Sequence, residues 1–462
     1  MFAGDNIQAI NTANGRQLMK LFLLAILILF LPVFFNLASY YIISAILFIF
    51  FGYLFFKDKL YFFSILSIPA LAYGQFIYFP ITVNWVYEAS LTEILLILVF
   101  SIFFIDKFIN GGLKEIRTNG LLYLLLVYLI ISLISFINIV DFRLYVAGLK
   151  TIVFSGLAYF LSLNLLDNKQ RINLFIYSLT ATVFILSVQI FIKFYQIGLS
   201  DQFFFERSSI VITLGAIATT AAILALILPV VLSLYFYLDK TNRMKSFLFI
   251  GFIIGALAMF LTLGKAAIFS LAVGLGYLFV KLKNKRIIFI LASLVFIVSS
   301  FIFFTSFFSG LLERISYTFI DANSKFRILE YQTGWRIIKD HFWFGVGAGQ
   351  QLYYFKKILN FNTAELVNNF FLQAWIDFGI IGLTLVIFIF SNLFKKIINS
   401  LKSLKSTELT LVFGFVSALI VSLINGLAEV TFFALPYSIV FWSIVGIFYN
   451  LEKYEADISH NN

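Results

Sequence analysis

The amino-acid sequence predicts an all-α polytopic membrane protein with about 12–14 transmembrane helices and one large extracytoplasmic loop. Of the 462 residues, 62% are hydrophobic and 12% are charged, and the mean hydropathy is +1.01. Soluble domains are about half apolar and about a quarter charged. The apolar residues lie in runs of about 20, the length that a helix needs to cross a bilayer. Cysteine is absent, which excludes disulfides and thiolate chemistry.

Windows of about 20 residues place the spans along the chain. The first apolar run follows a short polar N-terminus, lacks a small-residue cleavage site and leads into another span, so we predict no cleavable signal. The last ten residues are predicted to form a polar tail. The predicted spans are 18–36, 38–56, 60–79, 90–109, 119–140, 145–166, 171–198, 210–238, 244–262, 264–280, 286–308, 367–394, 409–427 and 430–450.

The net charge of +11 comes mostly from Lys and Arg in alternate loops. This positive-inside pattern predicts that both termini are cytoplasmic and that the long polar segment lies outside. The basic excess therefore predicts the lipid bilayer, and no nucleic acid, as a partner. We divide the chain into an N-terminal transmembrane bundle (1–200), transmembrane helices with outer-face basic residues (201–308), an extracytoplasmic loop (309–367), and C-terminal transmembrane helices with a short cytoplasmic tail (368–462).

The predicted topology leaves several outer basic residues unexplained. Lys265 lies between two closely spaced apolar stretches, where it either faces a water-filled cavity or anchors the helix end at the interface. Arg207 precedes the eighth span, and Arg327 and Arg336 lie in the long loop. Arg binds phosphate oxygens bidentately and Lys supplies a point charge. Together these four residues would suit a diphosphate.

Polar residues after the long loop are further candidates. Asn368 and Asn369 open the twelfth span, and Asp377 lies about two turns inside it. A carboxylate within a span is either functional or paired with a basic neighbour, and Glu429 at another outer end has the same two interpretations. The glycines at alternate positions in residues 345–349 allow close backbone approach, an anion-binding nest or a simple turn.

These motifs resemble the O-antigen ligase and O-antigen polymerase superfamily. The resemblance is carried by Arg327-x3-Tyr331, by WRIIKDHFWFGVGAG and by NNFFLQAWIDFGIIGL, in that order. LTLGKAAIF resembles the family's T-x-S-R-G/A segment, with Lys265 in place of arginine. ERSSIVITLGAIATTAAILALILP is a looser match that places Arg207 at another family arginine. The resemblance covers roughly residues 200–450.

The resemblance implies a C-type membrane glycosyltransferase of polysaccharide biosynthesis that needs neither a metal nor another cofactor. Such an enzyme moves a glycan from a polyprenyl (undecaprenyl) diphosphate to an acceptor hydroxyl at the outer face of the cytoplasmic membrane. The acceptor is another lipid-linked glycan for a polymerase, and lipopolysaccharide core or a protein for a ligase. Arg207, Lys265 and Arg327 would neutralise the diphosphate leaving group. Whether a chain-length regulator binds is left open.

The sequence departs from the family pattern at the ligases' His-Asn pair, which is Asn368-Asn369 here. The missing histidine favours a polymerase over a ligase. A general base, if one is needed, could be Glu365, Asp321 or Asp377.

Two other classes compete with a transferase. A lipid-linked glycan flippase or other polysaccharide transporter would have as many spans, but transporters usually show paired halves, short loops and broken helices near the midplane. A non-catalytic assembly or sensor protein is the third class. The single asymmetric outer loop, with the unexplained charges at the outer face, favours the transferase.

Overall fold

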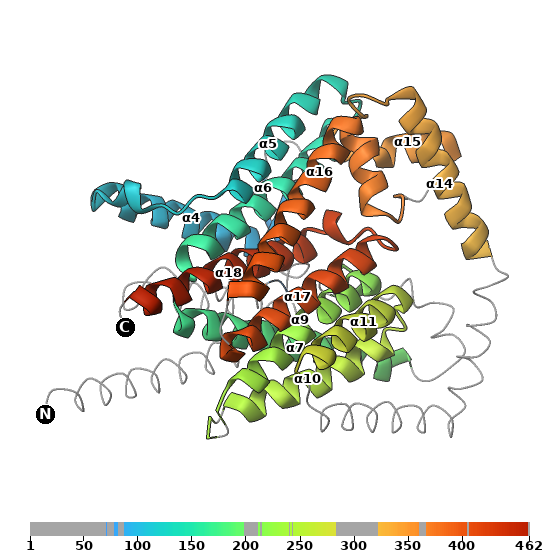
Figure 1. The fold of residues 1–462 in the computed structure, drawn as a ribbon. Coiled ribbons are helices and arrows are strands. Elements are labelled where there is room, and N and C mark those ends of the chain that lie inside the picture. Colours follow the sequence, from blue (N-terminus) through green and yellow to red (C-terminus); the bar gives the residue numbers. More distant parts are fainter. Residues whose placement is uncertain are drawn as a thin grey trace, which may run out of the picture.

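The computed structural model describes residues 71, 78–81, 87–197, 211–212, 215–239, 241–242, 244–282, 322–359, 366–403 and 406–460 (Figure 1). These residues are mainly helical, and eight of the described helices are long and apolar enough to cross a membrane. The predicted all-α polytopic class is therefore confirmed. The predicted spans 18–36, 38–56 and 286–308, and the candidates Arg207, Asp321 and Glu365, lie outside the described residues.

Six of the described helices begin and end within three residues of a predicted span. Two short antiparallel strand pairs interrupt the helical pattern, β1 (Tyr78–Ile81) with β2 (Tyr87–Ser90) and β3 (Val211–Ile212) with β4 (Gly215–Ala216). The helices are α4 (Leu91–Ile109), α5 (Gly120–Ile134), α6 (Phe142–Leu165), α7 (Lys169–Ile197), α9 (Ile217–Tyr237), α10 (Met244–Leu261), α11 (Lys265–Leu282), α14 (Ala322–Asp340), α15 (Gln351–Leu359), α16 (Phe370–Ser403), α17 (Ser406–Gly426) and α18 (Leu435–His460), with short 3-10 turns η3 (Gly112–Glu115), η4 (Ser135–Asn138) and η6 (Thr431–Phe433).

The predicted spans at 210–238 and 90–109 need correction. The span predicted at 210–238 becomes helical only at Ile217, because residues 211–212 and 215–216 form the β3–β4 pair. The span predicted at 90–109 is helical, but α4 carries Glu93, Asp106 and Lys107 and is not one of the eight candidates for membrane crossing. Its first turn is fixed by a capping box between Ser90 and Glu93.

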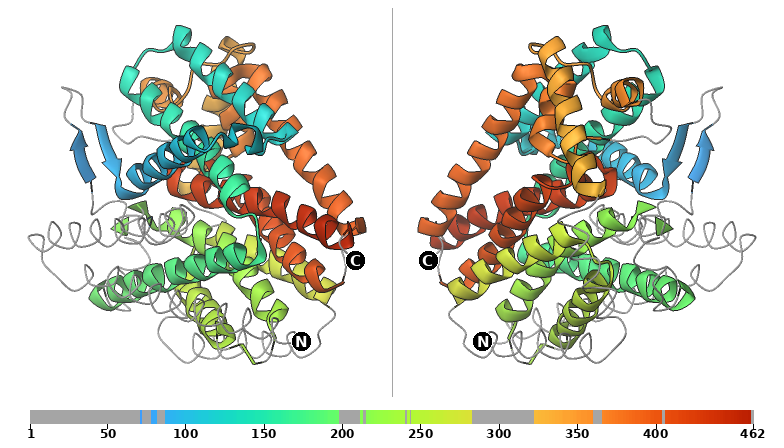
Figure 2. Two further views of the ribbon diagram at one scale, coloured as in Figure 1. Left: turned by 90° about the vertical axis from the view of Figure 1, so that its left-hand side faces the viewer. Right: turned by 90° about the vertical axis from the view of Figure 1, so that its right-hand side faces the viewer.

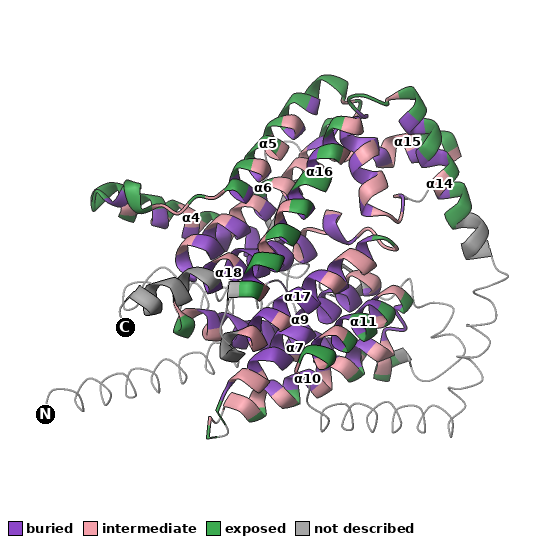
Figure 3. Ribbon diagram, viewed as in Figure 1, coloured by how far each residue is buried: buried purple, intermediate pink, exposed green. Residues whose placement is uncertain are grey.

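Helix α9 forms the centre of a bundle with α7, α10, α11 and α17 (Figures 1 and 3). Its residues are buried continuously from Thr220 to Leu234. Small residues let the surrounding helices approach closely, as is usual in membranes. On α10, for example, Gly251 and Gly255 face Thr180 and Val183 of α7, with no room for a larger side chain.

Helix α17 runs antiparallel to α9 and ends where α9 and α11 begin. Gly414, early in α17, packs on Ser233 near the end of α9. Gly264, just before α11, packs on Ala221 near the start of α9. The segment after α17 and the first residue of α11, Lys265, therefore lie at the same end of this bundle.

Helix α16 is a hairpin of two helical arms that meet at Gly379. The backbone of Gly379 is not helical, with φ 67° and ψ −166°. Phe370 and Phe390 have ring centroids only 5.9 Å apart, whereas 20 residues of straight helix would separate them by about 30 Å. Gly382 also lies against the carbonyl of Ala374. The predicted span 367–394 is therefore not one straight helix: residues 370–378 run to a tip and residues 380–403 return.

The break at Gly379 is stabilised by the segment that follows α14. The N–H groups of Val346 and Gly347 donate to the carbonyls of Ile376 (2.9 Å) and Asp377 (2.8 Å), and the N–H of Ile380 donates to the carbonyl of Phe342 (2.9 Å). These bonds satisfy backbone groups that a broken helix would leave unpaired in a membrane.

The three alternating glycines make this contact sterically possible. Gly345, Gly347 and Gly349 all have positive φ, at 68°, 102° and 69°. A Cβ on Gly345 would meet the backbone of Asp377, and one on Gly349 would meet the carbonyl of Leu144. Of the three predicted roles for residues 345–349, close backbone approach is the one that the contacts fit.

A buried glutamine fastens the same segment to the turn between α5 and α6. Gln350 Oε1 accepts from the N–H groups of Val140 (3.0 Å) and Asp141 (2.9 Å), and its Nε2 donates to the carbonyl of Asp141 (2.7 Å). Figure 2 shows α14, α15 and the tip of α16 gathered beside the end of α5. A small apolar core that includes Ile337, Phe355 and Ile376 joins α14 and α15 to the first arm.

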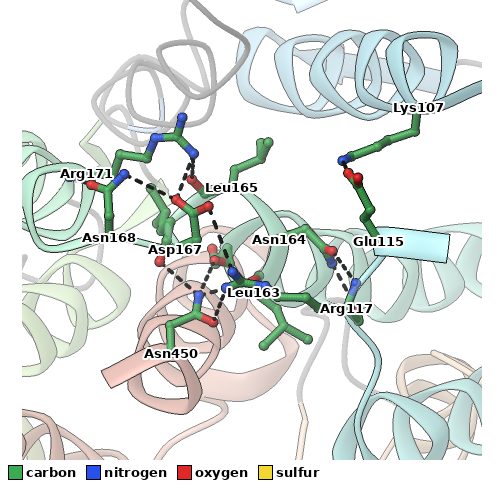
Figure 4. A network of polar contacts seen from close by, with 12 residues as sticks. Lys107, Glu115, Arg117, Leu163, Asn164, Leu165, Asp167, Asn168, Arg171 and Asn450 are labelled. Atoms are coloured by element: carbon green, nitrogen blue, oxygen red, sulfur yellow. Dashed lines mark hydrogen bonds and ion pairs between the residues drawn. The ribbon is translucent and has the colours of Figure 1, made fainter. Parts of the chain in front are cut away.

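A polar network holds the opposite end of α6 (Figure 4). Asn450 of α18 donates to the carbonyls of Ser162, Leu163 and Leu166 at 2.8–3.1 Å, capping the end of α6. Arg117, before α5, donates to Asn450 Oδ1 at 3.2 Å. The network thus joins the entrance of α5, the end of α6 and α18.

Candidate active site

Polar side chains from three segments meet beside the start of the first arm of α16. We call them the Arg327 cluster: Arg327, Glu330 and Tyr331 of α14, Asn368 and Asn369 before α16, and Glu429 after α17. Because the first arm is nine residues long, the cluster lies about 13 Å of helix below the tip at Gly379. The first arm therefore separates the cluster from residues 345–349, which contact the tip.

Arg327 crosses from α14 to the segment after α17. Its Nη1 donates to the carbonyl of Ala428 (3.1 Å) and its Nη2 pairs with Glu429 Oε1 (3.2 Å). The side chain of Arg327 is nevertheless 44% exposed, and that of Glu429 is 28% exposed. A pair this exposed adds little stability. The guanidinium is thus held on one side and accessible on the other.

Glu330 lies on the same helix but is buried, at 2% exposure. Its Oε2 accepts from Asn368 Nδ2 at 2.9 Å. The hydroxyl of Tyr331 donates to the backbone carbonyl of Asn368 at 3.3 Å. Two residues of α14 therefore hold both the side chain and the backbone of Asn368, which itself is half-buried.

Asn369 caps the first arm of α16. Its Oδ1 accepts from the N–H groups of Phe371 (3.0 Å) and Leu372 (3.1 Å), and its Nδ2 donates to the carbonyl of Leu427 (3.3 Å). A helix N-terminus carries a partial positive charge. The arm thus presents its positive end beside the cation of Arg327.

Lys265 is the first residue of α11 and is exposed. In that position it lies at the end of the bundle where the Ala428–Glu429 segment lies, and it makes a polar interaction of its own. The turn before it is strained: Leu263 is the one non-glycine residue with positive φ (53°) in the described part of the chain. Such strain persists where the surrounding structure imposes it.

Two predicted site residues are not brought to the cluster. Arg336 is exposed on α14, nine residues after Arg327. Nine residues are about two and a half helical turns, so the two side chains lie on opposite faces of the helix. Asp377 is buried near the tip of α16, eight residues from Asn369. The N–H groups of Gly349 and Gln351 face its carboxylate, although neither oxygen forms a hydrogen bond of normal geometry with a described residue. Both positions separate these residues from Arg327.

A lysine within a predicted span is paired with a buried carboxylate. Lys150 of α6 pairs with Glu93 of α4 at 2.6 Å, and Glu93 is 1% exposed. This ion pair joins two helices, which is sufficient to explain a lysine in that span. Within the described residues, no group of three or more His, Asp or Glu side chains lies close enough to hold a metal ion.

An apolar pocket adjoins the cluster through Phe370, the residue after Asn369. It opens between α5, α6, α16, η6 and α18, and a few hydroxyls interrupt its apolar wall. Its lining residues are Leu125, Tyr128, Thr151, Ile152, Ser155, Phe370, Val386, Ile389, Phe390, Phe432, Phe433, Ser438 and Trp442. A charged cluster beside an apolar pocket suits a molecule with a polar head and a hydrocarbon chain.

The sequence did not single out three buried polar residues near the cluster. Sequence reasoning did not identify Glu330 as a site residue because its partner, Asn368, is 38 residues away in the chain. Gln373 and Asn425 are buried on α16 and α17, and their side-chain amides form no hydrogen bond with a described residue. Each such amide group costs about 1–3 kcal/mol. Polar residues inside apolar helices are the one sequence signal that could have identified them.

The comparison with protein families supports the class of protein that the fold and the cluster define. Residues 250–387 match the family model described as O-antigen ligase. This range contains Lys265, Arg327, Arg336, Asn368 and Asp377, and it confirms the resemblance to the O-antigen ligase and O-antigen polymerase superfamily. The chain is thus a polytopic membrane protein in which residues 250–387 are similar to this superfamily. No curated protein matches the chain.

Proposed function

We propose that the protein transfers a glycan from a polyprenyl diphosphate to an acceptor hydroxyl at the outer face of the cytoplasmic membrane. The observation that carries this proposal is the accessible guanidinium of Arg327, held beside a helix N-terminus and an apolar pocket inside the matched family region. Positive charge suits the diphosphate, and the pocket suits part of the isoprenoid chain.

In the proposed reaction the acceptor hydroxyl oxygen bonds to the anomeric carbon of the donor sugar. The bond from that carbon to the diphosphate oxygen breaks, its electron pair leaves with the diphosphate, and the hydroxyl proton is released to water. Negative charge therefore develops on the leaving group. Arg327 and Lys265 stabilise that charge, because both lie at the same end of the bundle. Glu429 positions Arg327.

The other predicted residues are not equally supported as substrate-binding or catalytic residues. Arg207 remains a proposed diphosphate ligand on the resemblance alone, and Glu365 remains one of three proposed general bases, with Asp321 and Asp377. Arg336 and Asp377 are less suited to contact the same substrate atoms, since they lie away from Arg327. Metal independence, cytoplasmic termini and a chain-length regulator remain predictions.

A polymerase is the more specific proposal. Asn368 and Asn369 stand where a ligase would have a histidine and an asparagine, and a carboxamide cannot accept a proton at neutral pH. The acceptor of a polymerase is a second lipid-linked glycan, so products of O-antigen, capsule or exopolysaccharide type would be expected.

A transporter for lipid-linked glycans is the second candidate, and one observation favours it. The hairpin of α16 breaks at Gly379, and its first arm starts beside the Arg327 cluster; broken helices of this kind hold substrates in many transporters. The family match favours transfer, since it covers the first arm and the tip of this hairpin.

The glycan profile of a strain without the gene distinguishes the candidates. Single repeat units on their final acceptor, without long chains, would support a polymerase. Full-length polymer stranded on its lipid carrier would support a ligase. Repeat units trapped on the cytoplasmic leaflet would contradict transfer and support a flippase. Complementation with the wild-type gene should restore the full profile, and with Arg327→Ala it should not.

A further inference from the structure

The side-chain amide of Asn368 is held by a buried carboxylate. Its Nδ2 donates to Glu330 Oε2 at 2.9 Å. Glu330 is 2% exposed, while Asn368 is half-buried. The carboxylate is therefore the more deeply buried of the two groups.

This contact fixes which way the amide points. A carboxamide has a donor end and an acceptor end of nearly equal shape, and its orientation follows from its partners. An ionised carboxylate only accepts hydrogen bonds. The NH2 group must face Glu330, and Oδ1 must face the other way.

The backbone of Asn368 is fixed as well. The hydroxyl of Tyr331 donates to its carbonyl, and the N–H of the next residue, Asn369, donates to the carbonyl of Val367 at 2.8 Å. Asn369 then begins the first arm of α16 as its N-cap. With backbone and amide both held, Oδ1 is a preorganised acceptor, and the carboxylate that holds it lies about one helical turn from Arg327 along α14.

We propose that Glu330 is a positioning residue that orients Asn368 so that Oδ1 accepts a hydrogen bond from the hydroxyl of the acceptor glycan. The inference rests on the proposed transferase function and deepens it. Asn368 aligns the hydroxyl oxygen toward the anomeric carbon, and the proton leaves to water when the new bond forms. Donor binding depends on the cations and not on this amide.

A donor–acceptor exchange across the pair tests the proposal. In Glu330→Gln the new amide can pair with Asn368 in either orientation, and in Asn368→Asp two carboxylates face each other. Each single variant should lower transfer about tenfold, the kinetic equivalent of one hydrogen bond. In the double variant, E330Q supplies the NH2 donor and N368D supplies two acceptor oxygens, so the pair is restored with its polarity reversed. The double variant should therefore recover to within about threefold of wild type.

The readouts separate orientation from structure. Glu330→Gln should act mainly on the KM for the acceptor glycan, with the KM for the lipid-linked donor within about twofold of wild type. Gln332→Ala, an exposed neighbour on α14, serves as the matched control and should match wild type. Full activity of Glu330→Gln, or a double variant no better than the worse single variant, would overturn the proposal. Absence of transfer by the wild-type protein would overturn the proposed function instead.

Discussion

Two polar clusters in this protein contain similar side chains but differ in how exposed those side chains are. At the far end of α6, Asn450 is 4% exposed and has three carbonyls and Arg117 as partners. In the Arg327 cluster, Arg327 is bonded on one side only and 44% of its side chain is exposed. A polar group whose hydrogen-bond donors and acceptors are all satisfied within the protein stabilises the fold. A polar group that keeps an accessible donor or acceptor can bind a ligand.

The largest effect should come from Arg327, because it carries the accessible charge. Arg327→Ala should lower glycan transfer about 100-fold, the usual cost of removing one group that stabilises developing charge. Arg327→Lys should retain part of the activity, since it keeps the charge but loses the planar fork. Transfer by purified variants in detergent measures both. Wild-type activity in Arg327→Ala would remove Arg327 from the site.

The hairpin that carries Asn368 should fail when Gly379 gains a side chain. A Cβ there would lie 2.2 Å from the carbonyl of Trp343, and its φ of 67° disfavours other residues. Gly379→Ala should therefore lower stability by about 2 kcal/mol or more, seen as a lower unfolding temperature and less folded protein. Gly276→Ala in α11, where nothing lies within 4 Å of the added atom, is the control. Equal behaviour of the two variants would contradict the hairpin.

The network around Asn450 at the end of α6 should affect stability more than transfer, the opposite of Arg327. Asn450→Ala removes its hydrogen bonds to three carbonyls and to Arg117 and should cost about 2 kcal/mol of folding free energy. Transfer per folded molecule should change less than about twofold. Thermal unfolding and specific activity, measured on one preparation, test both halves. A loss of specific activity without a loss of stability would break the comparison.

Lys265 should give the smallest effect on transfer of the residues proposed to bind the diphosphate. Lys265→Ala should lower transfer about tenfold, because one charge-assisted contact to the diphosphate is lost. Lys265→Arg should keep the activity. Initial rates at saturating and limiting donor check the assignment. If the two variants behave alike, Lys265 is an interfacial anchor and not a ligand.

Much of the bundle follows from hydropathy, whereas the hairpin does not. Residues 370–402 contain an 18-residue window with a mean hydropathy of 2.1, so hydropathy predicts a span there. The break at Gly379 depends on hydrogen bonds with Phe342, Val346 and Gly347, which lie about 30 residues or more away in the chain. Long-range contacts of this kind leave no local periodic signal.

The candidate site was predicted in part. Arg327 and Asn368 came from motif order, and the structure brings them onto adjacent segments. The sequence alone could have separated Arg336 from the Arg327 site, since a nine-residue spacing puts the two on opposite faces of a helix. Asp377 was chosen because charges in spans are often functional. That its carboxylate faces the N–H groups of Gly349 and Gln351 is visible only in the tertiary structure. Glu330 required the contact to Asn368.

The most direct test of the account is glycan transfer by the purified protein in detergent, with two lipid-linked repeat units as donor and acceptor. Detergent removes the two compartments that transport requires, so only a transferase gives a product there. We predict one longer lipid-linked glycan and one released polyprenyl diphosphate for each bond formed. No product in detergent, from protein that moves lipid-linked glycan across vesicle membranes, would contradict the account and identify a transporter.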